Sequence, residues 1–319
     1  MAVQVAVLDD YQEVARACGP WDELGPGVEL TVFHDHIARD GVLRALLHDF
    51  EVIVAMRERT PFTAKRLAAL PKLRLLVTTG MGNAAIDMDA AREQGVCVCG
   101  TGSLPTPTAE LTWGLIIGLT RHICEEDRRI REGGWQRTIG PELAGHTLGI
   151  VGFGMLGRRV ARIAQAFEMR VIAWSENLDP DDAREAGAEP VAKEELFVRA
   201  DVVTLHTRLS DRTRGLVGAR ELGLMRPGTV LVNTSRGPIV DEKALLAALR
   251  RGAIAGAALD VYDKEPLPSD HPLREAPRTL LTPHIGYVST GTYAVFFRDA
   301  VEDIAAFLRG EPVRVLNAG

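Results

Sequence analysis

The sequence predicts an α/β protein built from two doubly wound parallel-sheet domains. Short, β-branched apolar runs alternate with helical patterns from end to end, which is typical of parallel sheets covered by helices on both faces. The 319 residues, 46% of them hydrophobic, supply enough apolar material for two cores. The strand-like runs fall into two series on either side of Ser103–Pro107, a proline-containing segment that interrupts regular structure. We therefore expect two domains joined by a hinge at this segment.

The first series of strands lies before the hinge. Its runs are short and bounded by polar residues, Gly or Pro, and they are Val3–Leu8, Leu30–Phe33, Val52–Val54, Leu75–Thr78 and Val96–Cys99. Thr60 followed by Pro61 predicts a helix N-terminus, with the helix continuing to Leu70.

The second series follows the hinge and a long helical pattern from Thr108 to about Arg131, which we expect to be a crossing helix. Its strands are Leu148–Val151, Val171–Trp174, Val202–Leu205, Val230–Asn233, Ala257–Asp260 and Leu280–Thr282. The last helical stretch, Thr290–Arg309, is too small for a domain and should pack on the N-terminal one. The expected domains are residues 1–102 with 287–319, and residues 103–286.

Composition narrows the class of partner. The formal net charge of −6 provides no basic surface for nucleic acid or an anionic membrane. No apolar run approaches the roughly 20 residues of a membrane span, and the N-terminus lacks a secretory pattern. The cysteines do not have metal-ligand or redox spacing and are interpreted as small buried side chains in a reducing compartment; they are Cys18, Cys97, Cys99 and Cys124. We expect a cytoplasmic protein with small-molecule partners and no metal.

A glycine-rich loop begins the second series. It follows the apolar run Leu148–Val151 directly and leads into an apolar-periodic helix, Arg158–Phe167, which is the strand-turn-helix context of a dinucleotide site. In such a loop the first glycine permits the turn, the second admits the pyrophosphate, and the third allows close helix packing. The residues expected at the cofactor are Gly152, Gly154, Met155, Leu156 and Gly157.

The residue after the second strand of this series bears on the choice of cofactor. An Asp or Glu commonly stands there and binds the adenosine ribose, whereas this chain has Ser175 followed by Glu176. A serine does not repel a 2′-phosphate, but Glu176 can restore a preference for NAD. Arg158 and Arg208 are candidate phosphate ligands or ordinary solvated arginines. The sequence leaves NAD and NADP both open.

Three later segments each follow a strand, and the carboxyl ends of parallel strands are where open sheets bind ligands. They are Asn233–Gly237, Asp260–Pro266 and Thr282–Gly286. They bring Arg236, a carboxylate and His284 to one sheet edge. A guanidinium binds a carboxylate in a forked pair and polarises an adjacent carbonyl, and an imidazolium donates a proton. The set suits hydride transfer to a 2-oxo acid, although an ion-pair arginine, a turn-capping Glu265 and a satisfied loop histidine are the structural alternatives.

These segments in this order, together with Thr79–Asn83, resemble the D-isomer-specific 2-hydroxyacid dehydrogenase family over essentially the whole chain, with members such as glyoxylate/hydroxypyruvate reductases and phosphoglycerate dehydrogenases. The resemblance implies a flavodoxin-like substrate domain, a Rossmann cofactor domain and a homodimer. It implies an oxidoreductase that transfers a hydride between NAD or NADP and a 2-oxo acid or D-2-hydroxy acid.

The resemblance also implies residue roles. Arg236 would bind and polarise the substrate, His284 would be the general acid or base, and Glu265 would orient and tune His284. Backbone N–H groups around Met81 and Gly82 would bind the substrate carboxylate, and Asp260 would hold the nicotinamide amide. The remaining residues expected to line the cofactor are Ser175, Thr207, Thr234 and Gly286.

The chain departs from the family pattern at Ser175, at Arg208, where a proline is common, and at Tyr287, where a small residue is common. We expect Tyr287 to shape the substrate pocket with Met56, Arg57 and Met81, and the identity of the 2-oxo acid is not predicted. An alternative is a non-catalytic, NAD(H)-sensing corepressor-like protein, which the missing adaptor tails and basic patch disfavour. Formate enzymes of this fold carry Gln in place of Glu265, which disfavours that activity.

Overall fold

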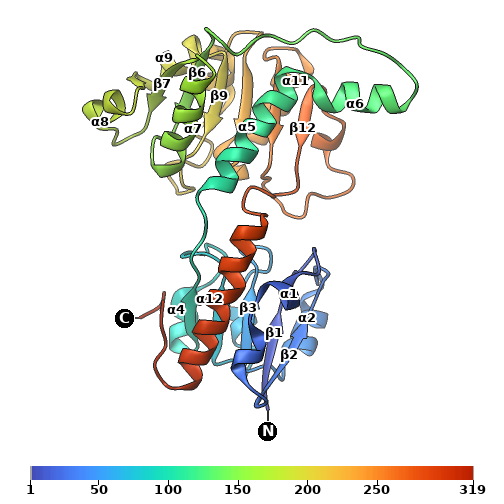
Figure 1. Ribbon diagram of the computed structural model, residues 1–319, viewed down its shortest axis with the longest axis vertical. Coiled ribbons are helices and arrows are strands. Elements are labelled where there is room, and N and C mark those ends of the chain that lie inside the picture. The colour runs from blue at the N-terminus through green and yellow to red at the C-terminus, as the bar shows by residue number, and fades with distance from the viewer. Residues whose placement is uncertain (1, 319) are drawn as a thin grey trace. The chain divides into compact units, whose positions relative to one another are not determined.

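A computed structural model describes residues 2–318, and the chain divides into two compact units (Figure 1). Unit 1 comprises Met1–Leu104 and Val288–Gly319, and unit 2 comprises Pro105–Tyr287. Each unit contains one parallel sheet with helices packed on it. The predicted α/β class with two parallel sheets is confirmed.

Unit 1 has a five-stranded sheet in the order β2-β1-β3-β4-β5, with every pair parallel. The strands are β1 (Val3–Val7), β2 (Val28–Val32), β3 (Val52–Ala55), β4 (Leu75–Thr78) and β5 (Cys97–Gly100). The helices are α1 (Ala15–Cys18), α2 (Asp40–Leu47), α3 (Ala64–Leu67), α4 (Met88–Glu93) and α12 (Thr290–Leu308), with a 3₁₀ turn η1 (Trp21–Leu24). Helices α2, α3 and α4 bury their apolar side chains in one core, while α12 packs with α1, η1 and β4.

Unit 2 has a seven-stranded parallel sheet in the order β12-β11-β10-β9-β6-β7-β8. The strands are β6 (Thr147–Val151), β7 (Arg170–Trp174), β8 (Glu189–Pro190), β9 (Val202–Leu205), β10 (Val230–Asn233), β11 (Gly256–Leu259) and β12 (Thr279–Leu281). The helices are α5 (Thr106–Thr120), α6 (Ile123–Arg131), α7 (Met155–Ala166), α8 (Pro180–Glu185), α9 (Lys193–Arg199), α10 (Ala219–Leu224) and α11 (Glu242–Arg250), with 3₁₀ turns η2 (Gly237–Ile239) and η3 (Pro272–Glu275).

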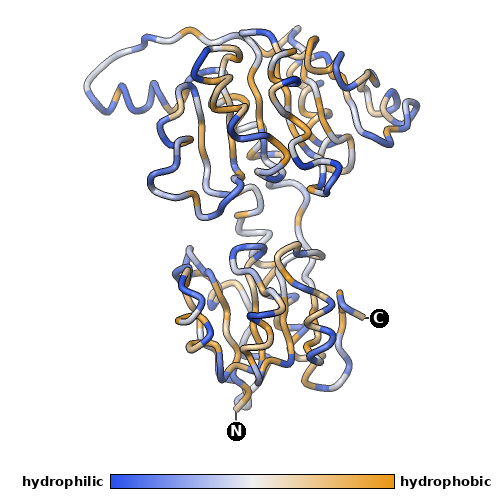
Figure 2. The backbone as a smooth tube through the Cα atoms, turned by 180° about the vertical axis from the view of Figure 1, so that it is seen from behind, coloured by the Kyte–Doolittle hydropathy of each residue, from blue (hydrophilic) through white to orange (hydrophobic). Residues whose placement is uncertain are grey.

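The sheet of unit 2 has an apolar core on each face. Side chains from α5 and α7 form one core, and side chains from α9, α10 and α11 form the other. Strands β6, β9, β10 and β11 are buried throughout, and Figure 2 shows apolar residues concentrated along the strands. The chain order reverses beside β6, whose neighbours are β7 and β9. A ligand site is expected at the carboxyl ends of these strands.

The helix expected from Thr108 to Arg131 is two helices, so that prediction was wrong. Helix α5 ends at Thr120, and His122 adopts a left-handed conformation with φ of 53° before α6 begins. The reason is a tertiary contact: a Cβ at Gly140 would lie 2.2 Å from Thr120 O, so the loop after α6 crosses the end of α5. The apolar periodicity of the sequence does not indicate this crossing.

Two other local predictions also need correction. The helix expected from Thr60 begins later, as α3, and Thr63 is its N-cap. Phe62 first pairs with the 85–87 segment, since its N–H donates to Ala85 O, and this bridge delays the helix. Strand β8, only two residues long and containing Pro190, was not predicted because proline indicates a strand edge at most.

None of the helices in the described part of the chain has the length and apolar character needed to cross a membrane.

Candidate active site

The glycine loop connects β6 to α7 through backbone contacts that exclude side chains. Gly152 has φ of 95°, and a Cβ there would lie 2.6 Å from Thr207 N. A Cβ at Gly157 would lie 2.3 Å from Gly152 O, so α7 packs directly on the turn. Gly154 is the N-cap of α7 and has open space at its Cβ position. The N–H groups at the start of α7 are therefore available to an anion such as a pyrophosphate.

A cavity of about 780 Å³ lies in unit 2 beside this loop. It is lined by the glycine loop, by the residues that follow β7, and by the segment from His206 to Leu216. Ser175 and Thr207 line this cavity, whereas Thr234, Asp260 and Gly286 are not among its lining residues. Its volume lies within the range of pockets that bind small molecules and cofactors. The glycine cradle, the helix N-terminus and the cavity together fit a dinucleotide.

Ser175 is held by the glycine loop itself, because Phe153 N donates to Ser175 Oγ at 2.6 Å. Arg158 forms an ion pair with Asp182 at 3.1 Å and lies over the Phe153 ring. Arg208 and Glu176 are exposed and also line the cavity. Charged groups of both signs therefore line the cavity.

His206 lies where β9 meets the cavity. Burial lowers the pKa of its imidazole to about 3, so the ring is neutral at ordinary pH. Its Nε2 lies 2.9 Å from Thr204 Oγ1, while its buried Nδ1 has no hydrogen-bond partner among the described residues. His206 was interpreted as structural from the sequence; the residue is half-buried and lines the cavity, and its structural role stays a prediction.

The second part of the site lies at the ends of β10, β11 and β12. His284 Nδ1 is 2.6 Å from Glu265 Oε2, and the second oxygen of Glu265 accepts a hydrogen bond from Tyr262 N at 2.9 Å. The carboxylate is thus fixed by the backbone and engages one nitrogen of the imidazole, which leaves Nε2 for another partner. His284 has φ of 55°, a conformation that non-glycine residues rarely adopt and that is frequent at functional sites.

Asp260 holds the loop that carries His284. Its carboxylate is fully buried and accepts hydrogen bonds from Thr282 Oγ1 at 2.6 Å and from the N–H groups of Ile285 and Gly286, both at 2.8 Å. Burial raises the pKa of this carboxyl, while the three donors oppose the shift. From the sequence, Asp260 was expected to contact the cofactor, and this positioning role was not expected.

Arg236 lies in a tightly connected turn after β10. Asn233 Nδ2 donates to Arg236 O at 2.9 Å, and its Oδ1 accepts from Ser235 N at 3.0 Å. A Cβ at Gly237 would lie 2.1 Å from the Tyr262 carbonyl carbon, so this turn packs against the segment that carries Glu265. Arg236 follows β10 and His284 follows β12, and in the sheet these two strands are separated by a single strand, β11.

A chain of hydroxyl groups links α5 to this region. Thr234 Oγ1 lies 2.8 Å from Thr112 Oγ1, which donates to Thr108 O at 2.7 Å, and Thr108 Oγ1 donates to Gly286 O at 2.9 Å. Thr234 and Gly286 were expected from the sequence, whereas the two helix threonines were not. Their spacing of four residues, which places both on one helix face, was the available signal.

In unit 1, the expected substrate residues lie in the loop after β4. Met81 is 59% exposed, and Gly80 N, just before it, donates to Thr101 Oγ1 at 2.8 Å. Arg57 has φ of 51° and donates from Nη1 to Thr79 O at 3.0 Å. Met56, which was expected to help shape the pocket, is buried beneath Thr79, with an exposed fraction of 1%.

The fold and site of unit 2 define a nicotinamide-dependent oxidoreductase with a histidine-carboxylate pair and an arginine at the sheet edge. The model of the D-isomer specific 2-hydroxyacid dehydrogenase NAD-binding domain matches residues 113–286. A glyoxylate reductase from Aeropyrum pernix is 40% identical over 262 residues, which cover 79% of this chain and 78% of that protein.

Solved structures agree with this similarity. A D-3-phosphoglycerate dehydrogenase oxidoreductase structure from Ralstonia solanacearum has a TM-score of 0.94 at 35% identity, covering 99% of this chain and 97% of the other. The D-lactate dehydrogenase of Aquifex aeolicus, solved with NAD and lactic acid, has a TM-score of 0.80 at 26% identity, with 96% of each chain covered.

The chain belongs to the D-isomer specific 2-hydroxyacid dehydrogenase family. It is an oxidoreductase that transfers a hydride between a nicotinamide cofactor and a 2-oxo acid or 2-hydroxy acid.

Proposed function

We propose that the protein reduces a small 2-oxo acid, with glyoxylate as the first candidate, through Arg236, Glu265 and His284. The similarity to glyoxylate reductases over most of the chain supports this substrate. Unit 2 would bind the cofactor, and unit 1, with backbone N–H groups near Met81 and Gly82, would bind the substrate carboxylate.

The observation that carries the proposal is the 2.6 Å contact between His284 Nδ1 and Glu265 Oε2. Because Glu265 holds Nδ1, the proton to be transferred sits on Nε2. His284 Nε2 gives this proton to the carbonyl oxygen while the Arg236 guanidinium stabilises the negative charge that develops there. A nicotinamide cofactor held at the glycine loop would supply the hydride for the carbonyl carbon.

The direct test follows NADH and NADPH absorbance with glyoxylate, hydroxypyruvate, pyruvate and phenylpyruvate. We expect turnover with at least one of them, and His284→Ala or Arg236→Ala should lower kcat by a factor of about 10² to 10⁴. His48→Ala and Arg184→Ala, which alter exposed side chains, are the matched controls. Near-normal turnover in His284→Ala would remove that residue from the reaction.

We propose that both NAD(H) and NADP(H) are accepted. The Ser175 hydroxyl, which accepts a hydrogen bond from Phe153 N, puts no carboxylate directly after β7, and Arg158 and Arg208 line the same cavity. The exposed Arg158–Asp182 pair costs little to break, so Arg158 is free to turn toward a 2′-phosphate.

Ser175→Asp tests this assignment. A carboxylate at this position would repel a 2′-phosphate, so we expect kcat/KM for NADPH to fall about tenfold to a hundredfold while that for NADH changes little. Ser210→Asp adds the same charge elsewhere in the cavity lining and is the control. An equal loss with both cofactors would contradict a role for residue 175 in phosphate discrimination.

We also propose a cytoplasmic homodimer. The four cysteines are all free thiols, which supports a reducing compartment. Helix α6 and the loop after it expose large apolar side chains that a second copy would cover, namely Ile123, Ile130, Trp135 and Ile139.

A further inference from the structure

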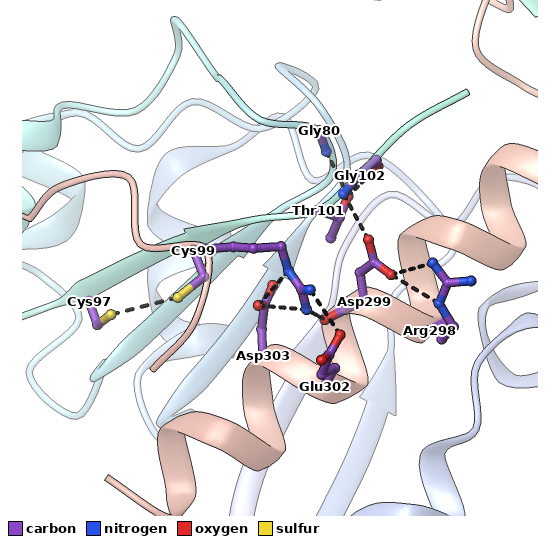
Figure 3. Close-up of polar contacts among 10 residues, drawn as sticks. Gly80, Cys97, Cys99, Thr101, Gly102, Arg298, Asp299, Glu302 and Asp303 are labelled. Atoms are coloured by element: carbon purple, nitrogen blue, oxygen red, sulfur yellow. Dashed lines mark hydrogen bonds and ion pairs between the residues drawn. The ribbon is translucent and has the colours of Figure 1, made fainter. Parts of the chain in front are cut away.

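Cys97 and Cys99 form a close pair of thiols on β5, the edge strand of the unit 1 sheet. Their Sγ atoms are 3.7 Å apart, because residues two apart on a strand point to the same face (Figure 3). Cys99 is buried and Cys97 is partly exposed. Neither cysteine takes part in the proposed reduction of a 2-oxo acid.

The surroundings of the pair give the two thiols different character. The two thiols share a hydrogen bond, which lowers the pKa of Cys97, and the same hydrogen bond together with burial raises the pKa of Cys99. Cys97 is therefore both the more reachable sulfur and the one that more readily becomes a thiolate, the form that attacks a disulfide.

The two thiols are a poor binding site for a metal ion. A structural zinc needs four protein ligands, and no group of three or more His, Cys, Asp or Glu side chains able to hold a metal exists within the described residues. Two adjacent thiols can nevertheless undergo a two-electron oxidation without any further protein ligand.

We propose that Cys97 and Cys99 are a reversible modification site for low-molecular-weight disulfides such as oxidised glutathione. The Cys97 thiolate attacks one glutathione sulfur, forming a mixed disulfide and releasing one glutathione thiolate. Cys99 then loses its proton and attacks the Cys97 sulfur, which forms the Cys97–Cys99 bond and releases the second glutathione. The two cysteines lose two electrons and two protons, and oxidised glutathione becomes two molecules of the reduced thiol.

The strand geometry makes such a bond strained and readily reduced. Residues two apart on a strand have Cα atoms about 6.4–6.8 Å apart, at the upper end of the range that a disulfide spans. Closing the bond must therefore shorten β5 locally. Strained disulfides are the labile ones, so reduced glutathione should reverse the modification.

The end of β5 connects this site to the loop after β4. Gly100 follows Cys99 directly, and a Cβ there would lie 2.8 Å from Gly80 O and 3.3 Å from Met81 Cα. The next residue, Thr101, accepts the hydrogen bond from Gly80 N, and Figure 3 shows Gly80 and Thr101 together at this end of the strand. A shorter β5 would displace Gly80 and Met81. The resulting loss of substrate binding rests on the proposed function, since Met81 and Gly82 are there assigned to the substrate carboxylate.

The modification itself is tested by mass, without any activity assay. The native protein is incubated with oxidised glutathione, quenched with a thiol-alkylating reagent, and analysed intact and after digestion. We expect a loss of two hydrogen atoms, a fall in titratable thiols from four to two, and a cross-link that maps to Cys97 and Cys99. Reduced glutathione should restore all four thiols.

Variants identify the order of the two steps. Cys97→Ser should acquire neither glutathione at residue 99 nor the cross-link, and Cys99→Ala should keep glutathione on Cys97 as a stable adduct. Cys124→Ser, which alters an exposed thiol of unit 2, should still form the cross-link. If Cys99→Ala fails to fold, Cys97→Ser and the wild-type map still decide the result. No cross-link in the wild type, or a lasting adduct on Cys97 alone, would overturn the proposal.

The connection to the substrate loop is measured separately. In oxidised wild type we expect kcat/KM for the 2-oxo acid to fall on the order of tenfold, as a small misplacement of substrate does. Reduced Cys97→Ser should keep wild-type kinetics and should not respond to oxidised glutathione. A wild-type protein that carries the cross-link with unchanged kinetics would overturn the connection.

Discussion

At the scale of single residues, Asp260 shows how one buried carboxylate positions the loop that carries His284. It accepts three hydrogen bonds from Thr282, Ile285 and Gly286, which flank His284 on both sides. An ionised carboxylate has acceptor sites for all three donors, whereas an amide would turn one donor group toward them. None of these three hydrogen bonds involves His284 itself. Asp260 therefore positions His284 through the residues beside it.

Asp260→Asn should accordingly lower kcat while the protein stays folded. We expect a loss of about 10² in kcat, because a misdirected amide displaces the loop and with it the imidazole. The KM for the cofactor and the near-UV spectrum separate misplacement from unfolding. Asp270→Asn changes an exposed carboxylate in the preceding segment and should behave as wild type. Equal kcat in the two variants would contradict the positioning role.

The proposed catalytic residues could be named from the sequence because each stands in a short, recognisable segment of the chain. Arg236, Glu265 and His284 each follow an apolar strand, and the sheet then aligns the three strand ends. The supporting residues were less visible. Thr112 reaches Thr234 across 122 positions of sequence, and only the packing of α5 on β10 brings the two hydroxyls together.

At the scale of elements, the junction of β6 and α7 depends on two glycines with different requirements. Gly157 has no room for a side chain, since its Cβ would lie 2.3 Å from Gly152 O. Gly154 has open space around its Cβ position and φ of −82°, which other residues adopt readily. Gly157 serves the helix–strand contact, and Gly154 serves only the approach of a ligand.

Gly157→Ala and Gly154→Ala should therefore differ in kind. We expect Gly157→Ala to lower the free energy of unfolding by about 1–3 kcal/mol through overpacking, measured by urea denaturation. Gly154→Ala should leave unfolding unchanged but weaken NADH binding, measured by titration of cofactor fluorescence. If both variants lost stability equally, the claim that Gly154 has room for a side chain would be contradicted.

The elements themselves were predictable wherever burial on both faces gives an uninterrupted apolar run. All eleven expected strands are present, with ends that shift by a few residues. The sequence failed where distant backbone contacts decide. The break at His122 follows from the crossing at Gly140, and the late start of α3 follows from the bridge between Phe62 and Ile86. Neither contact changes the local periodicity.

At the scale of the whole molecule, unit 1 carries a buried carboxyl that makes stability depend on pH. Burial raises the pKa of Asp303 from 3.8 to about 7, although Arg314, 3.0 Å away, opposes the shift. The folded chain thus retains a proton on Asp303 that the unfolded chain releases from about pH 4 upward. Because the folded state binds more protons in this window, its stability falls as pH rises from about 4 to about 7.

Comparison with Asp303→Asn isolates this contribution. Relative to the variant, the wild type should lose a few kcal/mol of unfolding free energy between about pH 4 and pH 7. Above that range the difference should stay constant. Hydrogen exchange of α12 amides reports on unit 1 alone. Glu302→Gln, at a more exposed neighbouring carboxylate, should show no such trend. A pH-independent difference for Asp303→Asn would mean that the carboxyl is ionised throughout.

The apolar surface of α6 and its following loop makes a prediction about assembly. Figure 1 shows this helix and loop extending away from the sheet of unit 2, and Trp135 and Ile139 are 74% and 96% exposed. Exposing such side chains costs free energy that a second copy recovers by covering them. Replacing both with Asp should leave the fold intact, because neither side chain belongs to a core cluster.

Size-exclusion chromatography with light scattering measures the outcome. The wild type should have the mass of two chains, and Trp135→Asp/Ile139→Asp the mass of one, with unchanged circular dichroism. Val198→Asp introduces one negative charge at a half-exposed apolar position on α9 and should remain a dimer. A monomeric wild type would refute the homodimer, while a dimeric double variant would place the subunit interface on another surface of the chain.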